Sequence, residues 1–449
     1  MNRKEAEDLV YASYMRAAAY QNYGDRDALR RKPELTKEMI RSRAKAPSLL
    51  VTGSKGKGSV ANMIAAILQQ HGKVGLMTSP HIADFRERFR INGRMIEEAS
   101  FARLMSQLEP EIRSLDAKLP SDECISPMGI QAALALQWFG EEGTDFNVLE
   151  CGKGARFDDV VNVPHTYAVI NSIFLEHTRE LGGSLEEIAF DKAHIISGTE
   201  ECVFVGPQEP QALAVIRQRA EALRVPVRCY GMDFRAENIR FSRDGMHFDV
   251  VTGAKCYENL CVPLLGEHQA RNAALAVAAC RGIAGELDVE EVRRALASLV
   301  WPGRMEILSK EPFVLLDACI NSASCGNVKQ VLKELGIDRA AVVIGIPDDK
   351  DYAGVAREMA PLTGTMILTA SGNPHYVFTD RQRVQLQEEG LAVCREACSG
   401  EAIARALASG LPVVILGTTS LVAEVEQLFH EFRAEESAKD NRLTGENMI

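Results

Sequence analysis

The feature that most constrains this chain is a glycine- and lysine-rich turn between an apolar run and a helical pattern. Residues 48–52 predict a strand and residues 60–68 predict a helix. The turn between them consists of Gly53, Ser54, Lys55, Gly56, Lys57, Gly58 and Ser59. This order of elements makes an anion site, because the backbone N–H groups of the turn converge on phosphate and the positive end of the helix dipole favours the charge.

The side chains of the turn suit a nucleotide. Lys57 can reach the outer phosphates, and the hydroxyl of Ser59 or Ser54 can ligate magnesium. The spacing differs from the usual P-loop: the stretch from Gly53 to Lys57 is two residues shorter, and Gly58 separates the lysine from the serine. The alternative is a helix-capping turn that binds nothing. The flanking strand and helix favour the nucleotide site.

Composition narrows the class of protein. With 449 residues, two or three domains are expected. The net charge of −11 argues against a general nucleic-acid binder. No apolar run approaches the roughly 20 residues that span a bilayer, and the charged N-terminus lacks a signal-peptide core. We therefore expect a cytoplasmic protein that binds neither nucleic acid nor membrane, with eleven structural or incidental cysteines.

Apolar strands alternate with amphipathic helices along the first part of the chain. Further strands are expected at 74–77, 146–150, 167–170 and 202–205. Helices are expected near 6–20, 99–116, 128–141, 184–197 and 209–222. This alternation predicts an α/β fold with a parallel sheet covered on both faces.

The middle of the chain changes character. Residues 225–262 alternate polar and apolar side chains around a turn at Arg243-Asp244-Gly245, which predicts a small antiparallel excursion. Helices near 267–283 and 288–298 follow, and Trp301-Pro302-Gly303 then breaks the chain. We place a domain boundary there, giving domains 1–300 and 301–436. The polar tail 437–449 is expected to be disordered.

A second α/β series follows the boundary, with strands expected at 313–317, 341–345, 366–369 and 412–417. Strands that end in Asp317, Gly345 and Gly417 direct the loops after them to one edge of the sheet, where α/β proteins bind ligands.

Two stretches resemble the folylpolyglutamate synthase and dihydrofolate synthase family of the Mur ligase superfamily. They are the glycine-rich turn and residues 78–93, which read Thr-Ser-Pro-His-Ile-Ala-Asp-Phe-Arg-Glu-Arg-Phe-Arg-Ile-Asn-Gly. From about residue 35 to about 430, several motifs recur in the order expected for the family. The resemblance implies a P-loop ATPase domain built on a parallel sheet, followed by a smaller Rossmann-like domain.

The resemblance also implies ATP-dependent amide formation. A substrate carboxylate attacks the γ-phosphate to give an acyl phosphate and ADP, and an amino group then displaces phosphate. Such chemistry depends on positioning and on cations that neutralise the transferred group. The implied substrates are a small acid and an amino acid, the implied cofactors are ATP and one or two Mg²⁺ ions, and we expect a monomer.

The resemblance assigns metal-binding roles to Ser59, Glu150 and His177. Glu150 ends an apolar strand, although such a carboxylate is usually solvated or caps a helix. His177 would hold a second magnesium, although most lone histidines are structural. Lys192 lies among apolar helix neighbours and is either a snorkelling lysine or, as often in the family, a carbamylated one that acts like a carboxylate ligand.

The nucleotide motif of the family matches residues 266–274. His268 and Asn272 lie four positions apart on one helix face and would contact the adenine and nearby phosphates, although a polar helix start is the plainer interpretation. Arg304, just after the domain break, would clamp phosphate when the domains close, or would be a surface arginine of a linker. Asp317 would suit a ribose hydroxyl. The implied catalytic set is therefore Lys57, Glu150, His177, Lys192 and Arg304.

The acid substrate would be bound mainly by the stretch from Ser79 to Arg90. The candidate substrate residues are Ser79, His81, Phe85, Arg88, Arg156 and Asn321. No catalytic base is evident, and an incoming amine near neutral pH needs only a weak one.

The chain departs from the family pattern at several positions. Ile320 replaces the histidine of Asp-Gly-Ala-His-Asn-Pro, and Gly129 replaces the glutamate of Thr-x-Phe-Glu. Gly-Leu-Gly-Gly-Arg-Leu-Asp becomes residues 152–158 with Phe157 for leucine. Leu-Asp-His becomes residues 175–177 with Glu176 for aspartate, and His194 stands where a glycine is usual.

These departures lie near positions expected to meet the substrates, whereas the phosphate turn is kept. They indicate either an ATP-using ligase with altered substrates or ordinary divergence of a folate enzyme, because fold and motif do not fix the substrate. Two other functions stay open. One is ligation of a non-folate acid in a specialised pathway, and the other is a nucleotide-binding module without ligase activity.

Overall fold

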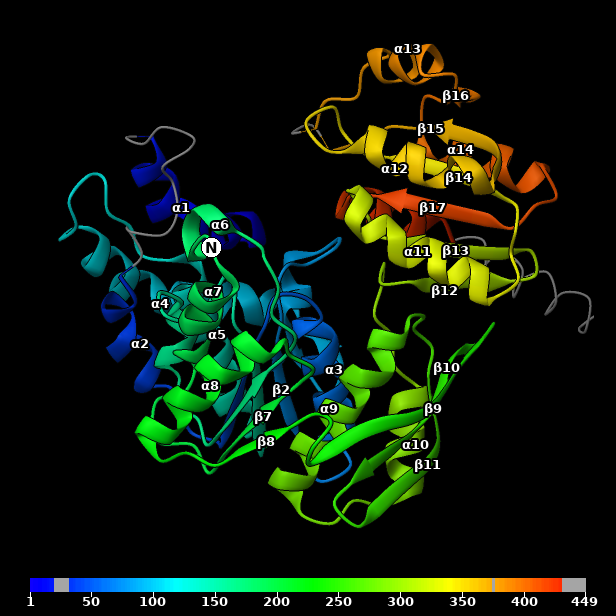
Figure 1. The fold of residues 1–449 in the computed structure, drawn as a ribbon. Coiled ribbons are helices and arrows are strands. Elements are labelled where there is room, and N and C mark those ends of the chain that lie inside the picture. The colour runs from blue at the N-terminus through cyan, green and yellow to red at the C-terminus, as the bar shows by residue number, and fades with distance from the viewer. Residues whose placement is uncertain (20–31, 374–375, 430–449) are drawn as a thin grey trace, which may run out of the picture. The chain divides into compact units, whose positions relative to one another are not determined.

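A computed structural model of the chain describes residues 1–19, 32–373 and 376–429 (Figure 1). The chain divides into two compact units. The first comprises residues 1–239, 248–261 and 268–299, and the second comprises 240–247, 262–267 and the chain from 300 onward. The tail predicted to be disordered, 437–449, lies outside the described residues.

The first unit is built on a large, mostly parallel sheet. Its spatial order is β4 (Arg94–Met95), β3 (Phe89–Ile91), β2 (Val74–Met77), β5 (Phe146–Glu150), β1 (Ser48–Thr52), β6 (Tyr167–Ile170), β7 (Cys202–Val205) and β8 (Val227–Cys229). The strands β2, β5, β1, β6, β7 and β8 run parallel, whereas β3 and β4 pair antiparallel at one edge of the sheet. Because β1 lies between β5 and β6, Thr52, Glu150 and Ile170 end at one edge of the sheet.

The strands predicted at 48–52, 74–77, 146–150, 167–170 and 202–205 are confirmed. One prediction was wrong: residues 225–262 are not a single antiparallel excursion. Val227–Cys229 forms β8, which extends the parallel sheet beside β7. A run this short carries too little periodicity to separate a parallel edge strand from the start of a hairpin.

Helices cover both faces of this sheet. They are α1 (Arg3–Ala18), α2 (Lys37–Arg41), α3 (Lys57–Leu68), α4 (Glu98–Asp116), α5 (Pro127–Glu142), α6 (Thr178–Leu181), α7 (Leu185–Ala193), α8 (Pro210–Leu223), α9 (Glu267–Ala284) and α10 (Val289–Ala297). The helix expected at 184–197 ends earlier, with His194 as its C-cap, and the short α6 was not predicted.

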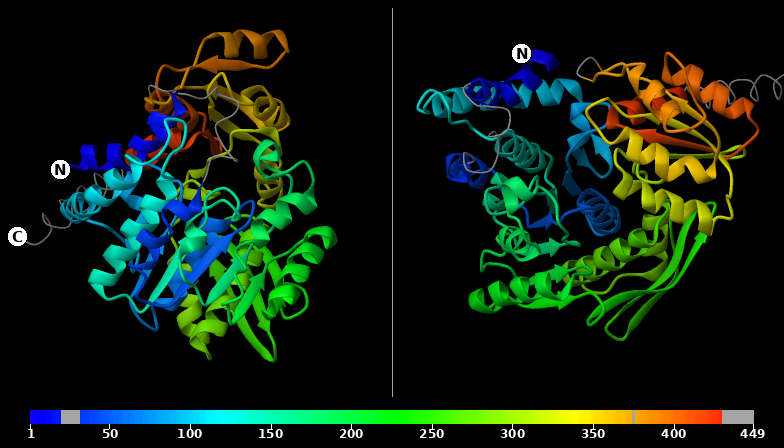
Figure 2. Two further views of the ribbon diagram at one scale, coloured as in Figure 1. Left: turned by 90° about the vertical axis from the view of Figure 1, so that its left-hand side faces the viewer. Right: turned by 45° about the horizontal axis from the view of Figure 1, so that its top comes forward.

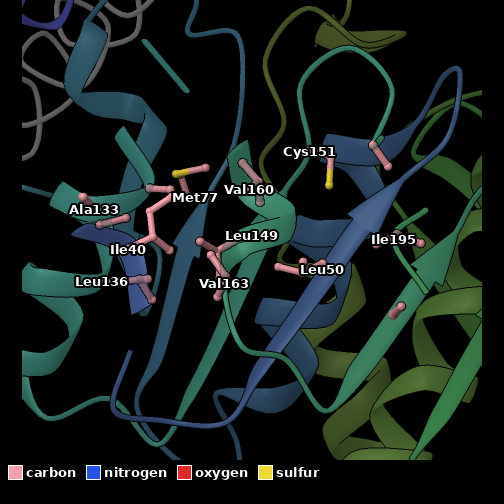
Figure 3. Close-up of a cluster of buried hydrophobic side chains, with 14 of the residues drawn as sticks. Ile40, Leu50, Met77, Ala133, Leu136, Leu149, Cys151, Val160, Val163 and Ile195 are labelled. Carbon is pink, nitrogen blue, oxygen red and sulfur yellow. The ribbon is translucent and has the colours of Figure 1, made fainter. Parts of the chain in front are cut away.

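The main core lies between the sheet and α5, α7 and α8. Figure 3 shows Leu149 of β5 between Leu50 of the neighbouring β1 and the α5 residues Ala133 and Leu136, and all four are buried. On the opposite face Phe204 of β7 packs against α9 so closely that a Cβ on Gly282 would lie 2.3 Å from its ring. Burial on both faces is why these strands are continuous apolar runs in the sequence.

A three-stranded sheet follows, formed by β9 (Phe234–Ser242), β10 (Gly245–Thr252) and β11 (Lys255–Val262) in the order β11-β10-β9. Residues 243–244 and 253–254 join the strands, and such short connections belong to antiparallel hairpins. The hairpin turn predicted at 243–245 is confirmed. Figure 2 shows this sheet from two further sides as a long ribbon.

The second unit has its own sheet, in the order β12 (Glu306–Lys310), β13 (Phe313–Asp317), β17 (Val413–Gly417), β14 (Ala340–Gly345), β15 (Thr363–Leu368) and β16 (Val393–Arg395). All but β12 run parallel. Its helices include α11 (Ser322–Glu334), α12 (Tyr352–Met359), α13 (Arg381–Glu388) and α14 (Ser399–Ala408), and residues 419–429 after β17 are helical as well.

The four strands predicted for this second unit are confirmed, whereas β12 and β16 were not predicted. Asp317, Gly345 and Gly417 end parallel strands at one edge, as expected. The predicted α/β architecture is therefore correct. In the part of the chain that the structure describes, every helix is too short or too polar to span a bilayer.

Candidate active site

The glycine-rich turn has a backbone that only glycine adopts easily. Gly53 has φ 143° and Gly56, the N-cap of α3, has φ 73°. A Cβ on Gly53 would lie 2.9 Å from the Cβ of Asn171, so the turn also lacks space for a side chain there. The Ser54 N–H donates to the carbonyl of Ser172 at 2.9 Å, which fixes the turn to the loop after β6.

Asn171 is the central polar contact of the turn, and sequence reasoning did not select it. Its Nδ2 donates to the Lys55 carbonyl at 3.0 Å and to Asn272 Oδ1 at 2.9 Å. Asn272 in turn donates to Gln269 Oε1 at 3.1 Å within α9, so the two bonds of Asn171 connect this helix to the turn. His268 is exposed. The signal that could have identified Asn171 is its position, because it directly follows the strand that neighbours β1.

Two lysines converge on one carbonyl at the base of the turn. Lys57 Nζ donates to the Gly53 oxygen at 3.2 Å, and Lys192 Nζ donates to the same oxygen at 2.9 Å. Lys192 is 1 % exposed and forms an ion pair with Glu176 at 3.0 Å. Burial, and then the charge of Lys57, lowers the pKa of Lys192. The arrangement concentrates positive charge where a polyphosphate would bind.

Glu150 lies at the end of β5, opposite Val51 of the strand that leads into the turn, and is 3 % exposed. Its Oε2 accepts a hydrogen bond from the Ser79 N–H at 2.9 Å, which links the 78–93 motif to the sheet edge. Ser59, in the first turn of α3, is buried as well. Carboxylate and hydroxyl oxygens are the ligands that Mg²⁺ prefers.

The described residues contain no group of three or more His, Cys, Asp or Glu side chains that could hold a metal by themselves. Magnesium often takes only one or two protein ligands and completes its shell with phosphate oxygens and water. Ser59 and Glu150 therefore suit magnesium that arrives with a nucleotide.

His177 has a strained backbone, with φ 46°, and precedes α6. Its side chain is 46 % exposed, and its Nε2 lies 4.0 Å from Glu176 Oε2. Burial, and then the charge of Lys153, lowers the pKa of His177. The neutral imidazole that a metal ligand requires is therefore favoured at neutral pH.

Three of the predicted acid-substrate residues form one cluster. Arg88 is 8 % exposed, donates to Gln131 Oε1 at 2.8 Å and to His81 Nδ1 at 2.9 Å, and lies 5.0 Å from the centre of the Phe85 ring. Burial, and then the charge of Arg88, lowers the pKa of His81. Ser79 instead contacts Glu150, and Arg156 lies elsewhere, as an exposed residue of the loop after β5.

The remaining predicted residues belong to the second unit. Asp317 Oδ2 accepts from the Met305 N–H at 2.9 Å, and Arg304 Nη1 donates to the neighbouring Gly303 carbonyl at 3.4 Å. Asn321 is the N-cap of α11, where its Oδ1 accepts from the Ser324 N–H at 2.9 Å. Ile320 is half-buried beside it.

Comparison with known proteins places this site in a family. The Mur ligase middle domain matches residues 51–280, which contain all the site residues of the first unit named above. A dihydrofolate synthase/folylpolyglutamate synthase of Bacillus subtilis is 32 % identical over 374 residues, covering 82 % of this chain and 84 % of that protein. The chain belongs to the folylpolyglutamate synthase and dihydrofolate synthase family of Mur ligases.

Other members of the synthase family are longer. A probable bifunctional folylpolyglutamate synthase/dihydropteroate synthase of Halobacterium salinarum is 35 % identical over 309 residues, which are 68 % of this chain and 37 % of that protein. Its counterpart in Haloferax volcanii is 33 % identical, with 83 % and 45 % covered. The chain therefore spans less than half the length of these two relatives.

Solved structures of the synthase family have the same fold. Folylpolyglutamate synthase of Mycobacterium tuberculosis, complexed with ADP and AMPPCP, is 25 % identical, with a TM-score of 0.79 over 94 % of this chain and 99 % of that one. A folylpolyglutamate synthase complex with AMPPCP and folate is 26 % identical, with a TM-score of 0.76 over 95 % and 99 %.

Proposed function

We propose that the chain is an ATP-dependent ligase that converts a carboxylate to an acyl phosphate and joins it to the amino group of an amino acid. One observation carries this proposal: Lys57 and Lys192 donate to the same Gly53 oxygen at the base of the phosphate turn. Nucleotide complexes of similar synthases support ATP as the nucleotide. Positively charged, preorganised groups are what phosphoryl transfer needs.

In this proposal the backbone amides of the turn and Lys57 bind the outer phosphates of ATP. Ser59 and Glu150 hold one magnesium ion and His177 a second. Bound magnesium would neutralise charge that develops on the transferred phosphoryl group. The fixed position of Glu150, held by the Ser79 N–H, preorganises the carboxylate for this role.

Lys192 acts in this proposal as an ammonium group rather than as a carbamate. Its Nζ donates to the Gly53 carbonyl and pairs with the Glu176 carboxylate, and carbamylation would replace that positive charge by a negative one. Intact-mass measurement in bicarbonate buffer tests this assignment, since a carbamate adds the mass of carbon dioxide.

The second unit has a supporting role in this proposal. We assign ATP binding to residues 1–300 and phosphate clamping and ribose contact to Arg304 and Asp317 of residues 301–436. His268 and Asn272 would contact the adenine end of the nucleotide. The monomeric state stays a prediction.

The acid substrate that relatives favour is a folate. The names of the similar synthases support dihydropteroate or a reduced folate as the acid and glutamate as the amine. We propose that Ser79, His81, Phe85 and Arg88 shape the pocket for the acid, and that Arg156 and Asn321 complete the set of substrate contacts.

A non-folate acid is the second candidate, and the packing around Gly129 favours it. A Cβ at this position would lie 2.6 Å from Asp159 Oδ1 and 2.6 Å from the Thr36 methyl group. Thr36 Oγ1 donates to the same Asp159 oxygen at 2.6 Å. The family's glutamate therefore cannot be restored without moving a buried hydrogen-bonded pair, so this departure is built into the surrounding structure.

The deciding experiment measures ADP release by the purified protein with ATP, magnesium, and a panel of acids and amino acids, with products identified by mass spectrometry. The panel includes dihydropteroate and tetrahydrofolate with glutamate. A glutamylated folate supports the first candidate, and turnover only with another pair supports the second. ATP binding without ADP release across the panel would contradict ligase activity and favour a nucleotide-binding module.

A further inference from the structure

Four side chains from two separate segments form a contiguous cluster on the first unit, which we call the Arg156 shelf. Its members are Arg156, Phe157, Phe190 and His194. The Arg156 guanidinium lies 5.0 Å from the centre of the Phe157 ring and 5.5 Å from that of Phe190. The Phe190 and His194 rings meet edge to face at 4.7 Å. The shelf joins the loop after β5 to the C-terminal end of α7.

The shelf presents both apolar and cationic surface to solvent. Phe190 is 47 % exposed and Arg156 is exposed. Burial, and then the charges of Arg219 and Arg156, lowers the pKa of His194. The carboxylate of the neighbouring Asp191 already accepts a hydrogen bond, from the Ala155 N–H to its Oδ1 at 2.8 Å.

Hydrogen bonds connect both segments of the shelf to the phosphate turn. Thr52 Oγ1, at the end of β1, donates to the Gly154 carbonyl at 3.2 Å. Lys192, two residues after Phe190, donates to the Gly53 carbonyl at 2.9 Å. The Ala155–Asp191 bond joins the two segments to each other. The shelf is therefore held in a fixed relation to the place where phosphate would bind.

The shelf also gathers departures from the family pattern. Phe157 stands where that pattern has leucine, and His194 stands where a glycine is usual. These positions belong to different motifs, yet Phe157 contacts Arg156, His194 contacts Phe190, and Arg156 and Phe190 contact each other. Changes in distant motifs that add aromatic surface at one place indicate a single binding surface.

We propose that the Arg156 shelf binds a planar aromatic part of the acid substrate and so contributes to substrate specificity. An aromatic ring can stack on Phe190, and the flat guanidinium of Arg156 binds the face of an electron-rich or anionic ring. This inference rests on the proposed ligase function, and it adds Phe157, Phe190 and His194 to the residues that select the acid.

Two measurements on the full chain test the shelf. The first is the dissociation constant of dihydropteroate, by calorimetry without ATP turnover, for the wild type, Phe190→Ala and Phe190→Tyr. We expect about a tenfold weaker binding for Phe190→Ala and recovery in Phe190→Tyr, because tyrosine keeps the stacking ring. The second is the pair of KM values, where only that of the acid should rise, also about tenfold.

Leu223→Ala is the matched control, because Leu223 is a 36 % exposed apolar side chain at the end of α8, outside the shelf. It should leave both KM values unchanged. Equal dihydropteroate binding by the wild type and Phe190→Ala overturns the proposal, as does no dihydropteroate binding by the wild type. A parallel rise in the KM of ATP also overturns it, since the shelf would then only support the helix that carries Lys192.

The outcomes separate the shelf from the ligase. Binding of dihydropteroate that depends on Phe190, without ADP release, supports the shelf and contradicts the proposed function. ADP release together with dihydropteroate binding that does not depend on Phe190 supports the proposed function and contradicts the shelf. If sedimentation shows that the wild type self-associates and that Phe190→Ala abolishes this, the shelf is a contact between copies and the proposal is wrong.

Discussion

The carboxyl-terminal edges of the two parallel sheets carry polar side chains of similar types but hold them differently. At the edge of the larger sheet, Lys192 reaches the carbonyl of Gly53, 139 positions away in the chain, and Glu150 accepts from Ser79, 71 positions away. At the edge of the smaller sheet, Asn321 bonds to Ser324, three positions on, and Arg304 bonds to the adjacent Gly303.

This difference separates two kinds of site. Buried charges held by distant elements keep their positions without a ligand, because moving them would break several contacts at once. Side chains held by their own neighbours are fixed by local backbone geometry and contribute little to the tertiary structure. The charged groups at the edge of the larger sheet are therefore preorganised, whereas Asn321 and Arg304 at the edge of the smaller sheet are held in capping and turn positions.

The strongest test of the comparison is Lys192→Met. The change leaves the Glu176 carboxylate without its ammonium partner, so we expect a loss of roughly 3 kcal/mol in the free energy of unfolding and at least about a hundredfold loss of ADP release. Denaturant unfolding and a coupled ADP assay measure the two effects.

The double variant Lys192→Met/Glu176→Gln sharpens this test. It should recover part of the stability, because the unpaired charge is gone, but none of the activity. Lys55→Met, which removes an exposed lysine of the same turn, should change stability by less than about 0.5 kcal/mol. Wild-type stability in Lys192→Met would show that the larger sheet edge is not held by its buried charges.

A second test concerns another buried ion pair of the first unit, away from the site. His165 Nε2 lies 3.0 Å from Glu200 Oε1, and the ring also contacts the carbonyls of Val163 and Ile195 at 2.7 and 2.9 Å. Burial opposes both charges. The pKa of Glu200 nevertheless falls to about 2 through its bonds to His165 and Ser197, and that of His165 rises through the bond to Glu200.

The His165–Glu200 ion pair should stabilise the protein most at intermediate pH, and this contribution should be lost at both lower and higher pH. The contribution of Glu200 is complete above its unfolded pKa of about 4.5 and is lost as the pH falls toward 2. That of His165 is complete below its unfolded pKa of about 6.5 and is lost as the pH rises through the higher folded value.

Glu200→Gln should therefore cost roughly 3 kcal/mol between pH 4.5 and 6.5, and less at either extreme. Urea unfolding at a series of pH values measures this. A cost that does not vary with pH would mean that the pair contributes packing rather than charge, and would weaken the view that buried ions fix the first unit.

The smallest expected effect belongs to the second unit. Asn321→Ala removes the N-cap of α11 and should lower stability by about 1 kcal/mol, the usual value for a capping side chain. Ser184→Ala, which removes the N-cap of α7 in the first unit, is the matched control and should cost a similar amount. Amide hydrogen exchange at the first turn of each helix measures both locally.

A much larger loss in Asn321→Ala than in Ser184→Ala would contradict the comparison. It would mean that Asn321 holds more than its own helix.

Much of the fold followed from local patterns. The strands of both parallel sheets and the hairpin at 243–244 were predicted from apolar runs and turn residues, because burial on both faces leaves a clear signal. The short edge strands β8, β12 and β16 were not predicted correctly, since their pairing depends on a neighbour far away in sequence.

The candidate site divides in the same way. Gly53 and Lys57 were selected as candidates from spacing, because a glycine-rich turn is a local structure. Asn171 was missed, because its importance depends on β6 lying beside β1 and on α9 reaching both. The role of Glu176 was likewise not predicted, because it depends on the ion pair with Lys192.

The sequence by itself determined the phosphate turn, the alternation of strands and helices, and the family. These depend on contacts between residues close together in the chain or on the number of ordered motifs. Only the tertiary structure decided which residues share the site: that Lys57 and Lys192 donate to one carbonyl, that Gly129 packs against Asp159, and that Phe157 and His194 lie on one shelf. The physical reason is that hydrogen bonds and ring contacts act over a few ångströms in space, so strand order, not chain position, selects the partners.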